Sequence, residues 1–442
     1  LDVLLAADAE CLLDLDLDQD IHHDDDLPGP QDREADLETF HFDVLVIGSG
    51  YGGSMVIYEL AGYGVNGNAL RIAMLERGNE FLPGSFPTRA ADLAGHVRFS
   101  TRKSGKVGGR RDGLFDVRIG PDVCVVQGNG LGGGSLINAG VLAEPNPEVF
   151  ADCRWPDEVR NDPKLRGLFD EVKTRLRGTR ARIVAQRRAT MNALGGSTKS
   201  EPACITVATQ DCEAEGIKAC IRCGDCATGC NFRAKLSVDV TLLAQAQRRH
   251  PACIRIVTGA TAVGFRKLGR SGWSVSVVHT DADLHRKQRR PYEIRTGKLV
   301  LAAGTLGSTE LLMRARAQGL DVSAMLGEQF SANGDSLSAI YGTARETKGV
   351  GDENLPFLPT RKMGPTITRM IDLRDKPERV VIQDLGIPGP LRRLFEETAS
   401  GTLAIRMLAQ CDRSKYRKDH PEPDSASIDT GAVDRSMVVV VI

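Results

Sequence analysis

Asp43-Val-Leu-Val-Ile47 runs directly into Gly48-Ser-Gly50-Tyr-Gly-Gly53. The apolar run predicts a short buried strand, and the pattern that follows, to about Ala61, predicts a helix. In a G-x-G-x-x-G turn the first glycine permits the tight bend, the second admits a pyrophosphate and the third lets the helix pack on the strand. A second strand, Arg71-Ile-Ala-Met-Leu-Glu76, ends in a carboxylate suited to ribose hydroxyls. The stretch predicts an α/β fold with a parallel Rossmann-like sheet that binds FAD or NAD.

A second glycine-rich stretch reads Gln127-Gly128-Asn-Gly130-Leu-Gly132-Gly133-Gly134-Ser135-Leu-Ile-Asn138-Ala-Gly140 and holds five glycines in seven residues. Glycine this dense lets the backbone lie against a flat or anionic ligand. Strand and hairpin signals recur from Ile254 to Val278. Lys298–Ala303 is a further apolar strand that runs into Gly304, and a helix is predicted from about Ser308 to Gln318.

The composition excludes several classes of protein. The chain has 442 residues with 57 Lys and Arg against 58 Asp and Glu, so the usual electrostatic case for a nucleic-acid partner is missing. No apolar run approaches the roughly 20 residues of a membrane span, and no secretory signal pattern is evident. Eleven Cys is an odd count, and four lie within eleven residues, which favours a reducing, cytoplasmic location over a disulfide framework.

With these motifs in order, the chain resembles the glucose-methanol-choline (GMC) family of FAD-dependent oxidoreductases, in its cholesterol-oxidase-like branch. The resemblance covers residues 42 to about 413. It includes the later strand-to-helix segment Ala302-Ala-Gly304-Thr-Leu-Gly307-Ser308 and the pair Leu326-Gly327 with Asn333-Gly334-Asp335. The resemblance implies that the first glycine turn and Glu76 hold the ADP half of FAD, while the second glycine stretch runs along the isoalloxazine.

The same resemblance implies individual contacts. Gly133, Gly134, Ser135 and Asn138 are expected to contact the flavin or its diphosphate. Val263 is expected to place a backbone contact on adenine, and Gly304 lies where the later strand returns to the cofactor. The implied reaction transfers a hydride from the carbon of a sterol-like or other hydrophobic alcohol to flavin N5, with oxygen or a redox partner as the electron acceptor.

The base that removes the hydroxyl proton is harder to place. The cholesterol-oxidase-like branch carries a catalytic His in an HPLGG-type segment near its C-terminus, and that segment is absent here. His420, before Pro421, is one candidate; an ordinary solvated His is the alternative. Asp384 is the other candidate, because it stands beside Gln383, which occupies the position of a catalytic Glu and cannot act as a base. The alternative is that Asp384 caps a turn.

The resemblance also sets the expected domains. Residues 1–39 are acidic and predict a disordered tail. Residues 40–335 are expected to form the FAD-binding domain, with an inserted cap and a Cys-rich loop at about 200–235. Residues 336–442 are expected to form a partial β-rich substrate-binding domain, interleaved and incomplete at the C-terminus, where an apolar run, Met437–Ile442, has no evident partner. A truncated or non-catalytic FAD-binding subunit is therefore an alternative function.

Four cysteines carry a second chemical signal. Cys220-x2-Cys223-x2-Cys226-x3-Cys230 has the spacing of a bacterial ferredoxin loop, although Asn231 replaces the usual proline. Without a second cysteine run, all four thiolates could serve one iron–sulfur cluster. A zinc site and a purely structural thiol cluster remain open, and zinc pairs are usually split by a longer loop. If a cluster is present, the protein could pass electrons from FAD to an iron–sulfur centre.

Overall fold

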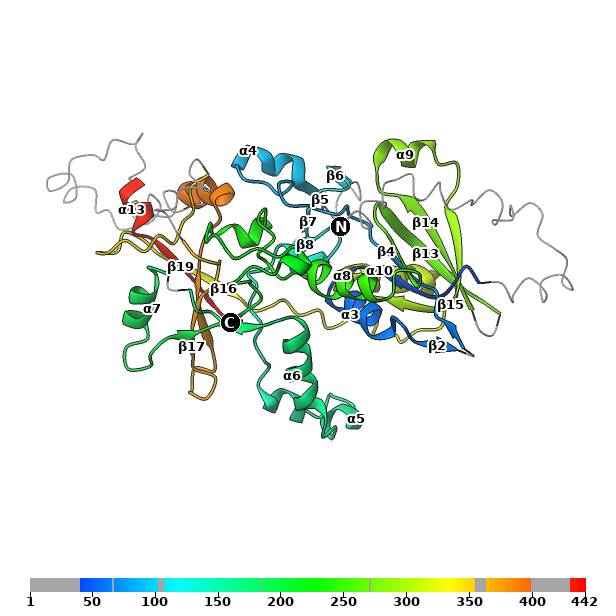
Figure 1. Cartoon of the computed structure of the whole chain (residues 1–442), viewed down its shortest axis with the longest axis horizontal. Coiled ribbons are helices and arrows are strands. Elements are labelled where there is room, and N and C mark those ends of the chain that lie inside the picture. Colours follow the sequence, from blue (N-terminus) through cyan, green and yellow to red (C-terminus); the bar gives the residue numbers. More distant parts are fainter. Residues whose placement is uncertain are drawn as a thin grey trace, which may run out of the picture. The chain divides into compact units, whose positions relative to one another are not determined.

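The structure is a computed structural model that describes residues 40–65, 67–101, 107–183, 185–269, 272–353, 363–398 and 430–442 (Figure 1). These residues divide into two compact units. The first unit holds 40–82, 94–136 and 237–330, and the second holds 83–93, 137–236 and 331–442. The acidic tail predicted for residues 1–39 lies outside the described residues.

A six-stranded sheet forms the centre of the first unit, in the order β12-β4-β1-β15-β14-β13. Its strands are β1 (Phe42–Ile47), β4 (Ile72–Leu75), β12 (Ile254–Val257), β13 (Ala260–Leu268), β14 (Gly272–His279) and β15 (Tyr292–Leu301). β12, β4, β1 and β15 are parallel, and β14 and β13 continue the sheet as antiparallel strands. The predicted Rossmann-like parallel sheet is therefore confirmed.

Helices cover both faces of this sheet. Leu45 and Ile47 of β1 pack in one cluster with Leu311 of α10 (Gly304–Ala317). Val44 and Val46 point to the other face and pack with Ile57 of α3 (Tyr51–Leu60), beside the π-helix η9 (Asp239–Leu243) and α8 (Ala244–Arg249). Successive side chains of a strand alternate between faces, so a strand covered on both sides reads as a continuous apolar run.

A four-stranded sheet completes the first unit, in the order β6-β5-β7-β8. Its strands are β5 (Val97–Thr101), β6 (Val107–Gly109), β7 (Phe115–Ile119) and β8 (Cys124–Gly128). Smaller elements of this unit are β2 (Gly64–Val65), β3 (Asn68–Ala69), η4 (Ala94–His96), η5 (Gly133–Leu136) and α9 (Ala282–Lys287). The ring of Phe99 lies over Gly108, where an added Cβ would stand 2.4 Å from Phe99 Cζ, so the glycines of β6 make room for the aromatic ring.

The second unit is built on a five-stranded sheet, in the order β10-β17-β18-β19-β16. Its strands are β10 (Glu201–Pro202), β16 (Ser336–Ile340), β17 (Arg369–Asp372), β18 (Val381–Leu385) and β19 (Met437–Val441). β19 pairs with both β16 and β18, so the apolar C-terminal run does have partners, contrary to the sequence analysis. β10 pairs with β17, and residues 137–236, which include the Cys-rich loop at about 200–235, belong to the second unit. The predicted domain ranges stay a prediction.

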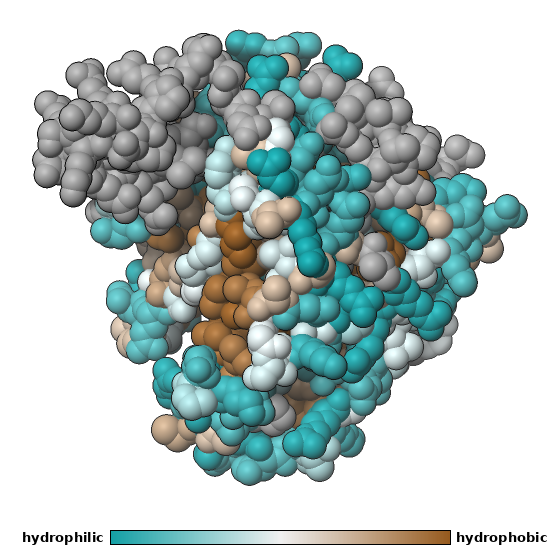
Figure 2. Space-filling view, turned by 90° about the vertical axis from the view of Figure 1, so that its left-hand side faces the viewer, coloured by the Kyte–Doolittle hydropathy of each residue, from teal (hydrophilic) through white to brown (hydrophobic). Residues whose placement is uncertain are grey.

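A narrow band of apolar residues is exposed on one side of the molecule. Figure 2 shows hydrophobic residues gathered in a band on the side of the molecule that carries β17, β19 and α7 (Arg188–Leu194) in Figure 1. Leu337 of β16, at the edge of the sheet, is 67% exposed. In the described part of the chain, no helix combines the length and the hydropathy that a membrane crossing needs.

The second unit also holds many short elements. They are α4 (Ala90–Leu93), η6 (Pro147–Ala151), α5 (Asp157–Arg160), α6 (Leu165–Arg175), β9 (Thr179–Arg180), β11 (Cys204–Ile205), η7 (Glu213–Glu215), η8 (Asp225–Thr228), η10 (Gly389–Leu391) and α13 (Thr430–Asp434). β9 and β11 pair with one another as a separate two-stranded sheet. The cysteine loop lies around η8.

Candidate functional site

The first glycine turn has no room for side chains at two positions. Gly48 follows β1 with φ 100°, and an added Cβ would lie 2.4 Å from Ala302 O. At Gly53, inside α3, an added Cβ would lie 2.0 Å from Gly48 O. Glycine at these two positions therefore lets the chain turn sharply and lets α3 approach the turn closely, as the sequence analysis expects.

Open space lies beside Gly50, where this turn leads into α3. α3 begins after Gly50 without a side-chain cap. An added Cβ at Gly50 meets no atom within 4 Å, and the same holds at Gly134 in the second glycine stretch. An uncapped helix N-terminus beside open space can receive the negative charge of a phosphate. The geometry therefore fits the pyrophosphate of a dinucleotide.

The two glycine stretches meet one another. An added Cβ at Gly133 would lie 2.9 Å from the Cα of Gly50. Ser49 links them further, because its Oγ accepts a hydrogen bond from Gly132 N at 3.0 Å and donates one to Glu76 Oε2 at 2.5 Å. Three segments that are far apart in the sequence therefore form one site.

Glu76 is the buried centre of this arrangement. Oε2 accepts hydrogen bonds from Ser49 N at 3.1 Å and from Ser49 Oγ, and Oε1 accepts one from Gly78 N at 2.8 Å. Burial raises the pKa of Glu76, and the hydrogen bonds from Ser49 and Gly78 oppose this only in part. An ionised carboxylate can accept about four bonds, so Glu76 keeps capacity for a ribose hydroxyl. Ser49 was not predicted, because it occupies a variable position of the G-x-G-x-x-G motif that carries no signal of its own.

Other predicted cofactor residues of the first unit have local roles. Ser135 is buried, and its Oγ donates to Gly132 O at 2.7 Å and accepts from Val238 N at 3.1 Å, which fixes the end of the glycine stretch. Gly304, at φ 74°, opens α10 directly after β15. Val263 lies where the register between β13 and β14 shifts, and its carbonyl accepts a hydrogen bond from Arg314 Nη1 at 3.1 Å.

The remaining predicted cofactor residue, Asn138, belongs to the second unit. Its Oδ1 accepts a hydrogen bond from Gly140 N at 3.1 Å, and its backbone carbonyl accepts one from Lys235 Nζ at 2.7 Å. The contact of Asn138 with a flavin stays a prediction.

Asp384 is a buried carboxylate whose two oxygens are bound by neighbouring protein groups. It is fully buried in β18, where its carboxylate pairs with Arg187 Nε at 3.0 Å and accepts hydrogen bonds from Thr368 N, Thr368 Oγ and Arg369 N at 2.7, 2.6 and 2.6 Å. A carboxylate with both oxygens committed inside the protein is a poor proton acceptor for a substrate. The geometry therefore argues against the predicted catalytic role of Asp384. His420, the other candidate base, lies outside the described residues.

The four cysteines of the loop are free thiols in the second unit. Cys220 Sγ accepts a hydrogen bond from Arg222 N at 3.3 Å, and Cys230 Sγ accepts one from Ala234 N at 3.4 Å. Burial, with the neighbouring Cys226, raises the pKa of the Cys220 thiol to about 12. Burial also raises the pKa of the Cys226 thiol.

A buried lysine, Lys235, donates hydrogen bonds to the backbone of the cysteine loop. Lys235 is only 3% exposed, and its Nζ donates to Cys226 O at 2.9 Å as well as to Asn138 O. Within the ranges that the structure describes, no three or more His, Cys, Asp or Glu side chains are grouped so that they could hold a metal ion. The geometry therefore does not support the predicted cluster, which stays a prediction.

Comparison with known proteins identifies the class. A family model described as GMC oxidoreductase matches residues 42–330, so the chain belongs to the GMC oxidoreductase family. A cholesterol oxidase from Mycobacterium tuberculosis is 28% identical over 322 residues, which cover 67% of this chain and 52% of that protein. A long-chain-alcohol oxidase from Arabidopsis thaliana is 22% identical over 307 residues, which cover 66% of this chain and 36% of that protein.

Among solved structures, the crystal structure of a formate oxidase is similar at TM-score 0.45 and 12% identity, over 91% of this chain and 72% of that chain. The chain spans about half the length of the cholesterol oxidase that it matches. Membership of the GMC family implies FAD as the cofactor.

Proposed function

We propose that this chain is an FAD-dependent oxidoreductase that oxidises the CH–OH group of a hydrophobic alcohol. The observation that carries the proposal is the meeting of the two glycine stretches, where Gly133 approaches Gly50 and Ser49 connects both to Glu76. The open space beside Gly50 and Gly134 is where the backbone can accommodate a dinucleotide. When bound, FAD supplies the hydride acceptor that the reaction needs.

The chain's own residues bind and orient the cofactor in this proposal. The uncapped start of α3 receives the pyrophosphate, and Glu76 holds the ribose with its remaining acceptor capacity. The proposed substrate class follows from the relatives, which are named as oxidases of cholesterol and of long-chain alcohols. Oxygen is the proposed electron acceptor, as those names also suggest.

An anaerobic titration tests the activity. We expect the flavin absorbance bands of the purified chain to bleach when cholesterol or a long-chain primary alcohol is added, and to return when oxygen is admitted. A matched long-chain alkane, which has no hydroxyl group, is expected to leave the bands unchanged. Flavin that stays oxidised with every alcohol would contradict the activity and would favour a non-catalytic FAD-binding subunit.

A second candidate function is electron transfer through an iron–sulfur centre, and one observation favours it. Two of the four loop sulfurs accept a hydrogen bond from a backbone amide, Cys220 from Arg222 N and Cys230 from Ala234 N. Hydrogen bonds to sulfur are among the means by which proteins tune iron–sulfur clusters. Such a cluster would suit a reducing compartment, and we propose a cytoplasmic location on the same ground.

Metal analysis of anaerobically purified protein tests this second candidate. The cluster predicts iron and acid-labile sulfide in equal amounts, lost in Cys226→Ser and retained in the control Cys253→Ser, which changes a half-buried cysteine of the first unit. Zinc without sulfide would mean a single-ion site. Protein with neither metal would leave the four thiols a structural role and would rule out the cluster.

A further inference from the structure

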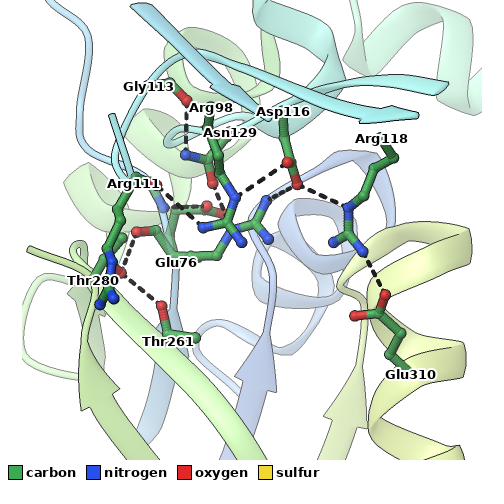
Figure 3. Close-up of polar contacts among 12 residues, drawn as sticks. Glu76, Arg98, Arg111, Gly113, Asp116, Arg118, Asn129, Thr261, Thr280 and Glu310 are labelled. Atoms are coloured by element: carbon green, nitrogen blue, oxygen red, sulfur yellow. Dashed lines mark hydrogen bonds and ion pairs between the residues drawn. The ribbon is translucent and has the colours of Figure 1, made fainter. Parts of the chain in front are cut away.

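Three arginines surround one buried carboxylate in the first unit. Asp116, on β7, has no exposed side-chain surface. Arg77 Nη2 lies 2.7 Å from its Oδ2, Arg98 Nε 3.1 Å from its Oδ1, and Arg118 Nε 3.3 Å from its Oδ2. Figure 3 shows Arg98 and Arg118 pointing toward Asp116, with Glu310 of α10 beyond Arg118. The arginines come from the end of β4, from β5 and from β7, so the carboxylate joins the two sheets of the unit.

Asp116 is connected to the second glycine stretch through Arg77. Arg77 Nε donates to Asn129 Oδ1 at 2.7 Å, and Asn129 Nδ2 donates to Gly113 O at 2.8 Å. Asn129 is 1% exposed and stands between Gly128 and Gly130. A guanidinium group donates in a rigid fork, so Arg77 fixes its two partners relative to one another.

The turn after β4 lies directly against the same stretch. An added Cβ at Gly78 would stand 2.4 Å from the carbonyl oxygen of Asn129 and from Gly130 N. Leu131 N donates to Asn79 O at 2.9 Å. Moving Arg77 would therefore shift the glycine stretch in two ways. The Arg77 side chain is bonded to Asn129, and the turn at Gly78 and Asn79 packs against the same stretch.

The Asp116 carboxylate offsets the repulsion among the three arginines that surround it. Burial alone would raise the pKa of Asp116, but the guanidinium groups of Arg77, Arg98 and Arg118 outweigh it and lower that pKa. Burial, together with repulsion from Arg77, lowers the pKa of Arg98. Without Asp116 the three cations would repel one another at close range, and Arg118 would keep Glu310 as a partner.

We propose that Asp116 is a positioning residue for the cofactor site. By holding Arg77 in place it fixes Asn129, and through Asn129 it holds the Gly128–Gly134 stretch in the shape that receives FAD. The proposal rests on the proposed function for the identity of the ligand. The competing role is that of an anchor between two sheets, which would affect stability and leave the glycine stretch unchanged.

The test follows hydrogen exchange in peptides covering residues 128–136 of the full chain, both as purified and after bound FAD is removed. Asp116→Asn is expected to raise amide exchange in these peptides and to weaken FAD binding about tenfold, the equivalent of one charged hydrogen bond. Arg77→Lys keeps the charge but loses the fork, so we expect the same direction of change. The matched control is Asp43→Asn, which breaks the Asp43–Arg71 pair at the opposite end of β1 and β4 and is expected to alter neither readout.

The outcomes separate this proposal from the proposed function. Faster exchange in the 128–136 peptides, with weaker FAD binding, supports both. Faster exchange in a chain whose wild type binds no FAD would end the proposed function and leave the positioning role intact. Unchanged exchange in Asp116→Asn and Arg77→Lys would overturn the positioning role, whatever happens to the melting temperature.

Discussion

Arg187→Met is expected to lower the free energy of unfolding by about 3–5 kcal/mol, because removing one partner of a buried ion pair leaves the other charge uncompensated. Arg187 and Asp384 both have fully buried side chains, 3.0 Å apart. Arg187 also donates to Met363 O at 3.1 Å and to Pro365 O at 2.9 Å, so the substitution leaves buried carbonyl groups without a donor as well. Urea unfolding monitored by circular dichroism measures the change.

The control for this prediction is Arg154→Met. Arg154 pairs with Asp152 in the same unit, but its side chain is 84% exposed, so the unfolding midpoint is expected to stay where it is. Equal midpoints for Arg187→Met and the wild type would show that the buried pair does not hold the second unit together.

Gly48→Ala is expected to destabilise the chain by about 2–5 kcal/mol and to abolish FAD binding, since it combines two sterically costly changes. Gly48 has φ 100°, a conformation that side chains disfavour, and an added Cβ would stand 2.4 Å from Ala302 O. The backbone at 302–303 cannot move away without disturbing the start of α10. Thermal unfolding and flavin fluorescence on addition of FAD measure the two effects.

Gly67→Ala separates strain from steric conflict. Gly67 has φ 82° in the same unit, but an added Cβ there meets no atom within 4 Å. This substitution is expected to cost only the roughly 1–2 kcal/mol of a left-handed residue and to leave FAD binding unchanged. If Gly48→Ala bound FAD as tightly as Gly67→Ala does, the tight turn would not be part of the cofactor site.

Local pattern was enough to predict the centre of the first unit. The apolar run of β1, the spacing of Gly48, Gly50 and Gly53, and the strand ending in Glu76 follow from rules that act within one strand–turn–helix unit. The second glycine stretch was recognisable because glycine at this density has few uses other than close backbone approach.

What could not be predicted depends on pairs far apart in sequence. Arg187 and Asp384 are separated by 197 positions, so the sequence showed Asp384 only as a free carboxylate and a candidate base. β19 pairs with β16 and β18, which are distant in the sequence, so an isolated apolar run does not reveal these partners. Asp116 and its arginines likewise look like ordinary surface charges in the sequence, and only the folded chain brings them together.

The most direct measurement of the central claim is an equilibrium titration of the flavin-free wild-type chain with FAD, monitored by the quenching of flavin fluorescence. We expect saturable binding of one FAD per chain, because the two glycine stretches, Ser49 and Glu76 come together in one site. A wild-type chain that is folded by circular dichroism and yet binds no FAD would contradict it.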